Sequence, residues 1–287
     1  DRARGHCLAG NVRKIIATHT VQIIDQVPLR DVVHLDRDRD ETVRIRRLTD
    51  GGTDPGLGTD ADLTRFAGDL AEQLGVSTSA ILFERCFLLV EGPTEKRSFP
   101  RLFRLATEVS LREAGIVLLD ANGNGSVLKL AEYLAAMQKP VHAIIDKDSL
   151  RDHKKIFCKD NLEAHGIGED HIEYLGDPNE LEELFGDAQW SDTANAHWPR
   201  HDSDLWTPAD FTNQRADGKK FSKEISNMLS RGSRSPAPKP DLISRIAERI
   251  TIKDDIPKPL LTAFDRLLAA AKPPSGPEPA TDRHTGS

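Results

Sequence analysis

Two short apolar runs that end in acidic residues constrain this chain more than any other feature. Residues 86–90 read CFLLV and are followed by EGPTE, and residues 141–145 read VHAII and are followed by DKD. Each run is almost continuously apolar, which is typical of a strand buried on both faces of a parallel sheet. Since the carboxyl ends of parallel strands share one edge, we expect Glu91, Asp146 and Asp148 to converge in one crevice.

Further strands and helices alternate with these two runs. We predict strands at 116–120 and 171–175, and helices at 94–114, 127–137 and 152–165. The connections between strands are long enough for right-handed crossovers. The pattern predicts an α/β fold over residues 84–185, Rossmann-like, with a mostly parallel sheet and helices on both faces.

Composition divides the rest of the chain into four segments. Residues 1–48 contain strand-like runs such as KIIA at 14–17, and residues 49–83 form a Gly- and Asp-rich linker that continues into helices. Residues 186–271 hold all three tryptophans, which we expect to anchor a core, and helical patterns. Residues 272–287 are rich in Pro, Gly and Thr and are predicted to be disordered.

Charge and composition exclude several classes of protein. The 287 residues include 39 Lys and Arg against 46 Asp and Glu, so the net charge is −7. This balance argues against nucleic-acid binding by bulk charge, although bound divalent cations would reverse the sign locally. No apolar run approaches the ~18 residues of a membrane span, so no membrane association is expected. Three widely separated cysteines argue against a disulfide framework and favour a cytoplasmic location.

The acidic residues suit a hard divalent cation. Carboxylate oxygens in a partly open site favour Mg²⁺ or Mn²⁺. Glu95 lies about one helical turn beyond Glu91, where it would help to hold a second ion, and two ions about 4 Å apart clamp both oxygens of a phosphodiester displacement. Structural explanations stay open: Glu is favoured in the first turn of any helix, and Asp-x-Asp is common in loops and caps.

The order of these elements resembles a known domain. Strand, Glu-Gly, helix, strand, the Gly-rich loop NGNGS at 122–126, helix, strand and Asp-x-Asp are similar to a Toprim domain, the metal-dependent phosphoryl-transfer module of primases, topoisomerases and certain nucleases. The stretch FLLVEGPTEKRSF at 87–99 resembles the OLD (overcoming lysogenisation defect) family. KIIATHTVQIID at 14–25 resembles the closing strand and switch-histidine loop of the ABC-type ATPase that precedes the Toprim nuclease in OLD proteins. The resemblance implies the C-terminal part of an OLD nuclease, beginning inside the ATPase.

The resemblance also assigns roles to acidic residues. The implied metal ligands are Glu91, Glu95, Asp146, Asp148 and Glu182. Glu91 would be the central ligand and a general base. Glu182 is chosen from the acidic segment NELEELF at 179–185, in which Glu180 and Glu183 are rivals and an acidic helix face is the alternative explanation.

A lysine from the C-terminal helices would stabilise charge on the scissile phosphate. GKKF at 218–221 resembles the family's Gly-Lys segment, so Lys219 and Lys220 are the candidates and Lys253 is a rival. Each of them is otherwise an ordinary solvated lysine. Residues 230–240, which are rich in Pro and Ser, are predicted to be a loop.

The resemblance to OLD proteins implies a DNA endonuclease that uses two Mg²⁺ or Mn²⁺ ions and leaves 5′-phosphate and 3′-hydroxyl ends, with a role in phage defence or DNA repair. DNA is the implied partner, with self-association through the ATPase region and a helicase as further implications. His19 would sense ATP in the whole protein, but the sequence contains no GxxxxGK[ST] loop, so we expect no ATP binding by this chain. Two alternatives stay open: another Toprim phosphoryl-transfer enzyme, primase-like or acting in RNA maturation, and a non-catalytic nucleic-acid-binding or assembly module.

Overall fold

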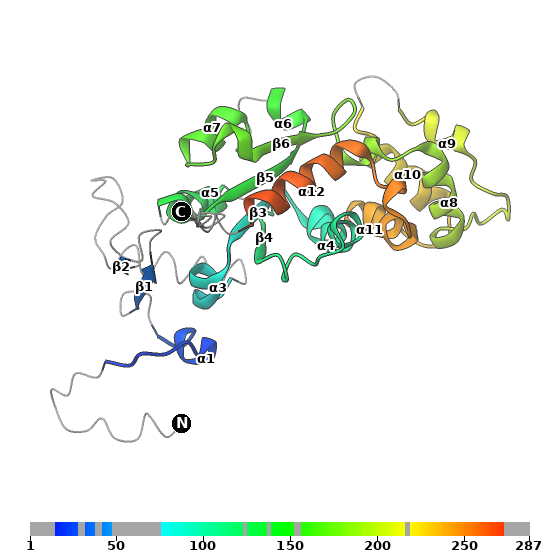
Figure 1. Cartoon of the computed structure of the whole chain (residues 1–287). Helices are drawn as coiled ribbons and strands as arrows, with labels where there is room; N and C mark the ends of the chain where they lie inside the picture. The colour runs from blue at the N-terminus through cyan, green and yellow to red at the C-terminus, as the bar shows by residue number, and fades with distance from the viewer. Residues whose placement is uncertain are drawn as a thin grey trace, which may run out of the picture.

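A four-stranded parallel sheet lies at the centre of the fold (Figure 1). The computed structural model describes residues 15–27, 32–37, 42–47, 76–122, 125–136, 139–151, 156–215 and 219–272. In the sheet the strand order is β4-β3-β5-β6. The strands are β3 (Cys86–Val90), β4 (Ile116–Asp120), β5 (Val141–Asp146) and β6 (Ile172–Leu175). The predicted parallel α/β sheet is therefore confirmed, with both diagnostic apolar runs as its central strands.

The register places the strand ends together. Val90, the last residue of β3, pairs with Asp120 on one side and Ile144 on the other. Asp146 at the end of β5 pairs with Leu175 at the end of β6. Residues that follow β3 and β5 therefore emerge at the same edge of the sheet, as expected for parallel strands.

Helices cover both faces of the sheet, and β3 shows this residue by residue. Cys86, Leu88 and Val90 belong to one apolar core, which includes α4 (Pro93–Thr107). Phe87 and Leu89 belong to a second core on the opposite face. The helices that build this second core are α3 (Thr78–Phe83), α5 (Ser126–Ala136) and α7 (Lys159–Ala164). Alternate side chains thus point into different cores, and the strand has no polar face.

A helical region extends the core on the α4 side. Its elements are α8 (Asp187–His197), α9 (Pro208–Thr212), α10 (Phe221–Gly232), α11 (Lys239–Arg249) and α12 (Lys258–Ala270). In Figure 1 α11 lies beside α4, and the two helices contact each other extensively. Trp190 is fully buried and packs against Phe185, Phe211 and Phe221, while Trp198 and Trp206 are also buried. The prediction that the tryptophans anchor a core is confirmed.

Several element boundaries differ from those predicted. Helix α4 ends at Thr107 rather than 114, because Glu108 takes the left-handed conformation with φ of 64°. The predicted loop at 230–240 is too long: α10 continues to Gly232 and α11 begins at Lys239. Prolines around Lys239 suggested a break, but proline is also favoured in the first turn of a helix.

The N-terminal segments are short where they are described. Residues 15–20 have no regular secondary structure, so the strand predicted at 14–17 is wrong at 15–17; strands require a partner ladder. Next come α1 (Val21–Ile24) and an antiparallel pair, β1 (Val33–Arg37) and β2 (Val43–Arg47). The Gly-rich part of the linker and residues 273–287 lie outside the described residues. No helix in the described part of the chain combines the length and apolar character needed to cross a bilayer.

Candidate metal centre

Glu91 connects the ends of the two central strands. It directly follows β3, and its Oε1 accepts hydrogen bonds from the Ser149 hydroxyl at 2.7 Å and from the Asp146 backbone N–H at 3.2 Å. Ser149 lies in the short helix α6 (Asp148–Arg151), which begins just after β5. The carboxylate of Glu91 is therefore held at the sheet edge by residues around the end of β5.

Glu95 reaches the same place from the first turn of α4. Gly92 is the N-cap of this helix, and Pro93 is in its first turn, where proline is favoured. Glu95 is only 7% exposed. Burial raises the pKa of Glu95, and the neighbouring carboxylates of Glu182 and Glu91 raise it further.

The segment after β6 brings a third group of carboxylates to the cluster. Gly176 turns the chain here with φ of +140°, and a Cβ on it would lie 2.5 Å from the Asn179 backbone. The Asn179 carbonyl accepts from the Asp148 N–H at 3.0 Å. The Leu181 N–H donates to Asp146 Oδ1 at 3.1 Å. The turn thus docks the 3₁₀ helix η3 (Leu181–Leu184) against the end of β5.

Asp146, Glu180 and Glu182 form a compact carboxylate triad. One ligand oxygen from each lies within 4.8 Å of the others, and Glu180 and Glu182 are each only 1% exposed. Oε1 of Glu182 is buried without a hydrogen-bond partner. Burial raises the pKa of Asp146 and of Glu182, and nearby carboxylates add to the rise at Asp146. Such a group cannot be fully ionised without a cation.

Glu180 and Glu183 were rivals of Glu182, and the structure separates their positions. Glu180 joins the triad, and its carboxylate also accepts from the Ser222 N–H at 2.9 Å and the Ser222 hydroxyl at 2.8 Å. Glu183 instead caps η3, since its Oε2 accepts from the backbone N–H groups of Asn179 and Glu180 at 2.6 Å. Both Glu180 and Glu182 are thus placed to bind a cation, whereas Glu183 has a local structural role.

Lys239 is the residue that sequence reasoning missed. It is the first residue of α11, and its Nζ lies 3.3 Å from Glu180 Oε1 and 3.9 Å from Glu182 Oε1. Burial alone would lower the pKa of Lys239, but the surrounding carboxylates of Glu182, Glu180 and Asp146 raise it well above its usual range. No sequence motif marks Lys239. It lies in the Pro-rich stretch 230–240, which the sequence predicts to be a loop.

The predicted lysines lie at different distances from the cluster. Lys220 Nζ donates to Asp148 Oδ2 at 2.9 Å, and this hydrogen bond raises the pKa of Lys220. Lys219 instead lies 3.8 Å from Glu224 and is exposed. Lys253 is exposed in the 3₁₀ helix η4 (Lys253–Asp255), and within the described residues no contact joins its side chain to the carboxylates.

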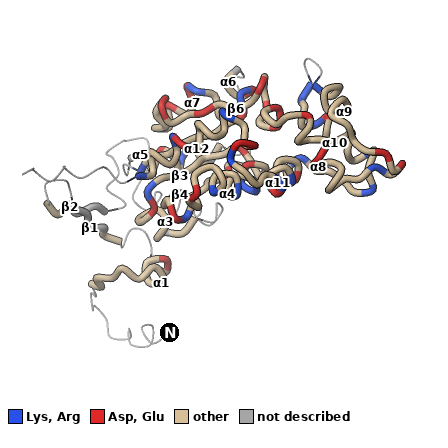
Figure 2. Tube along the Cα trace, turned by 45° about the vertical axis from the view of Figure 1, so that its right-hand side comes forward, with Lys and Arg blue, Asp and Glu red and all other residues tan. Residues whose placement is uncertain are grey.

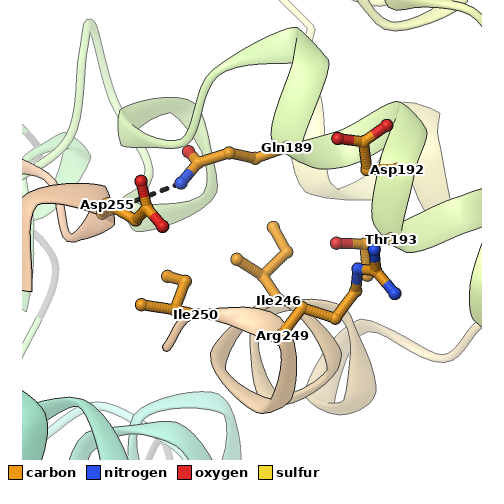
Figure 3. A pocket seen from close by; sticks show the side chains of 7 residues that line it. All are labelled: Gln189, Asp192, Thr193, Ile246, Arg249, Ile250 and Asp255. Atoms are coloured by element: carbon orange, nitrogen blue, oxygen red, sulfur yellow. Dashed lines mark hydrogen bonds between the residues drawn. The ribbon is translucent and has the colours of Figure 1, made fainter. Parts of the chain in front are cut away.

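The helical region also has a separate hollow of about 210 Å³ between α8, α11 and η4 (Figure 3). The residues that line it are Gln189, Asp192, Thr193, Ile246, Arg249, Ile250 and Asp255. The Gln189 amide donates to the Asp255 carbonyl at 2.8 Å across one side. None of the clustered carboxylates lines this hollow, so it is separate from the candidate metal centre.

The donor set fits a hard divalent cation. All five predicted ligands provide carboxylate oxygens, which Mg²⁺ and Mn²⁺ prefer. Glu91, Glu95, Asp146 and Glu182 influence one another electrostatically, and Asp148 lies two residues from Asp146. The orphaned Oε1 of Glu182 is a buried acceptor that a cation would satisfy. In Figure 2 acidic and basic positions are interspersed along the described parts of both the sheet and the helical region.

Comparison with known proteins agrees with the sequence motifs. Residues 82–148 match the family model described as the TOPRIM domain of overcoming lysogenization defect protein-like proteins. Similar solved structures include the C-terminal region of the Burkholderia pseudomallei OLD protein, with 15% identity and a TM-score of 0.45 over 66% of this chain and 100% of that one. Another is the C-terminal region of the Xanthomonas campestris pv. campestris OLD protein, with 18% identity and a TM-score of 0.43 over 67% and 96% of the two chains. No match was found among curated protein sequences. Residues 82–148 are thus similar to the Toprim domain of OLD-like proteins, in agreement with the resemblance that the sequence motifs suggested.

Proposed function

We propose that this chain is a DNA endonuclease that hydrolyses phosphodiesters with two Mg²⁺ or Mn²⁺ ions. The observation that supports the proposal most strongly is the triad of Asp146, Glu180 and Glu182, in which one buried oxygen of Glu182 has no hydrogen-bond partner. A structural role alone would leave this concentration of buried carboxylates unexplained, since it raises their pKa values at a cost in stability.

Each acidic residue has a proposed place in this chemistry. Glu91, Glu95, Asp146, Asp148 and Glu182 would together hold the two ions, and Asp146, Glu180 and Glu182 offer ligand oxygens at one place in the cluster. When bound, the ions supply Lewis-acid polarisation of the phosphate and of the attacking water. Clustered carboxylates thereby become able to bind a polyanionic substrate, because the cations reverse the local charge.

Protein groups would complete the reaction. Glu91 is the proposed general base and takes a proton from the attacking water, while the new P–O bond forms, the bond from phosphorus to O3′ breaks, and the departing O3′ takes a proton from solvent water. The products are a 5′-phosphate and a 3′-hydroxyl. Lys220 and Lys239 are the lysines that contact the cluster, so they are better placed than Lys219 or Lys253 to stabilise charge on the phosphate.

Cleavage of supercoiled plasmid DNA tests this proposal. We expect nicking by the purified chain with Mg²⁺ or Mn²⁺ and none with EDTA. Replacing Glu91 or Asp146 by Ala should lower the rate by at least about 100-fold, because loss of even an outer partner of a metal ligand costs up to that much. Asp120→Asn is a matched control at the end of β4, where the side chain faces Lys96 instead.

Parallel assays of RNA cleavage, nucleotide polymerisation and DNA binding distinguish the alternatives. Metal-dependent cleavage of RNA but not DNA, or nucleotide polymerisation, would favour another Toprim phosphoryl-transfer activity. DNA binding without turnover of any nucleic acid would favour a non-catalytic module. An ATP requirement would have to come from a region with a phosphate-binding loop, which these 287 residues lack. Roles in phage defence or DNA repair, self-association and a helicase partner are further parts of the proposal.

A further inference from the structure

The carboxylate cluster is contacted by a cationic side chain of the protein itself, Lys239. The ammonium group of Lys239 lies between two carboxylates that are each 1% exposed, at 3.3 Å from Glu180 and 3.9 Å from Glu182. Buried carboxylates of this kind require a compensating charge. Lys239 therefore provides part of the positive charge that the centre needs before any ion binds.

We propose that Lys239 is the internal counter-ion of the metal-free centre, and that a divalent ion binds by displacing its ammonium group from Glu180 and Glu182. The inference rests on the proposed function, because the displacing ion is the one that the nuclease would use. In this inference the ammonium group of Lys239 and the divalent ion compete for the carboxylates of Glu180 and Glu182.

The contact with Lys239 leaves the centre incompletely satisfied. At 3.9 Å from Nζ, Glu182 Oε1 is too distant for a hydrogen bond, and this oxygen is the one without a partner. An ammonium group carries one charge, whereas a divalent ion carries two and binds carboxylate oxygens directly. A divalent ion would thus satisfy the same oxygens better than Lys239 does.

The position of Lys239 makes displacement feasible without a change of fold. The Lys239 side chain is 44% exposed although its partners are buried, so part of the lysine side chain borders solvent. Lysine has a long flexible stem, and the ammonium group can withdraw by rotation of side-chain bonds. Lys239 is also the first residue of α11, where a positive charge is unfavourable to the helix dipole. The carboxylates, rather than the helix, hold the charge in place.

Lys239 and Lys220 differ in how deeply their carboxylate partners are buried. Lys220 contacts Asp148 at the rim, where the lysine side chain is 59% and the aspartate side chain 18% exposed. Water screens such a pair, so its loss should change ion binding little. Lys239 contacts the two most buried carboxylates, and its charge would repel an ion bound to the same oxygens.

Titration of the full chain with Mn²⁺ in the absence of DNA tests the inference by calorimetry. For Lys239→Met, which removes the charge and keeps the length of the side chain, we expect Mn²⁺ affinity to rise about tenfold or more. Lys239→Arg, which keeps the charge, should stay within about threefold of the wild type, as should Lys223→Met on the exposed face of α10. Equal or weaker Mn²⁺ binding by Lys239→Met would overturn the inference.

A second measurement on the wild-type chain does not depend on the folding of a variant. Acylation of lysines, read by mass spectrometry, should modify Lys239 at least about threefold faster with saturating Mn²⁺, while Lys223 is unchanged. Mn²⁺ binding with no change at Lys239 would contradict the displacement. If Mn²⁺ affinity rises in Lys239→Met but the wild-type chain cleaves no nucleic acid with Mn²⁺, the inference holds and the nuclease proposal fails. If neither protein binds Mn²⁺, both fail.

Discussion

The sheet and the helical region contribute opposite charges to one centre. Glu91 directly follows β3, Asp146 ends β5 and Asp148 lies two residues beyond it, so their positions come directly from strand order. Lys220 and Lys239 come from α10 and α11, far along the chain, and reach the carboxylates only through tertiary packing. The negative half of the centre is thus encoded locally, and the positive half depends on how the helices pack against the sheet.

Disrupting the helical region alone should give the largest effect. Trp190 is fully buried, stacks on Phe211 and donates from Nε1 to the Glu182 carbonyl at 3.3 Å. We expect Trp190→Ala to lower the free energy of unfolding by about 3–5 kcal/mol, as measured by urea denaturation. Trp190→Phe, which keeps an aromatic ring, should lower the free energy of unfolding by less than Trp190→Ala does. Equal stability of the alanine variant and the wild type would show that the helical core does not support the centre.

Acidification should weaken the sheet through His142, which is buried in β5. Its pKa falls from the usual 6.5 to about 4, mainly through burial and then through the stacked ring of His171. As the pH falls from about 6.5 to 4, the unfolded chain binds a proton that the folded chain excludes, so this contribution to stability is lost. The full loss is about 3 kcal/mol.

The effect of His142 is measured by comparing the free energy of unfolding of the wild type and of variants across pH 4–7.5. His142→Gln should remove this part of the pH dependence of unfolding. His201→Gln, which changes an exposed histidine, should keep it. The same slope in wild type and His142→Gln would assign the acid sensitivity to other groups.

The contact between the two regions should contribute an intermediate amount. Arg101 on α4 donates to the carbonyls of Ala247 at 2.6 Å, Glu248 at 3.1 Å and Ile250 at 3.3 Å, at the end of α11. Arg101→Ala should lower the free energy of unfolding by about 1–3 kcal/mol, because these carbonyls lose charged donors at a helix C-terminus. Arg245→Ala, whose side chain pairs with Glu248 on the surface, should change stability by less than about 0.5 kcal/mol. Equal effects of the two changes would contradict a bridging role for Arg101.

The rim pair should give the smallest effect on stability. Lys220 and Asp148 lie 2.9 Å apart but are both partly exposed. We expect Lys220→Met to change the free energy of unfolding by less than about 1 kcal/mol. Thermal unfolding at low and high salt checks this, since screening should remove most of any difference. A larger, salt-independent loss would mean that Lys220 is part of the buried centre.

The sequence predicted the sheet edge well because its signals are local. Continuous apolar runs identified β3 and β5, and the residues after them had to lie at one edge. Glu182 was chosen by family resemblance, with Glu180 as a rival, and burial explains why both belong to the cluster. The turn at Gly176 that brings them there requires a positive φ, which the strand pattern did not indicate.

Lys239 could not be predicted in the same way. Its contact with Glu180 joins residues 59 positions apart, and neither has a spacing motif relative to the other. Prolines around it indicated a loop, although they also suit the first turn of α11. Long-range packing of α11 against α4 decides where this charge lies, and periodicity in one segment carries no information about that packing.

A crystal structure of the wild-type chain with Mn²⁺ tests the central claim most directly. Anomalous scattering identifies the ion without reference to activity. We expect a peak within coordination distance of Asp146 and Glu182, with the ammonium group of Lys239 withdrawn from Glu180. A fully soaked crystal with no peak at these carboxylates, and with Lys239 still in contact with them, would contradict the account.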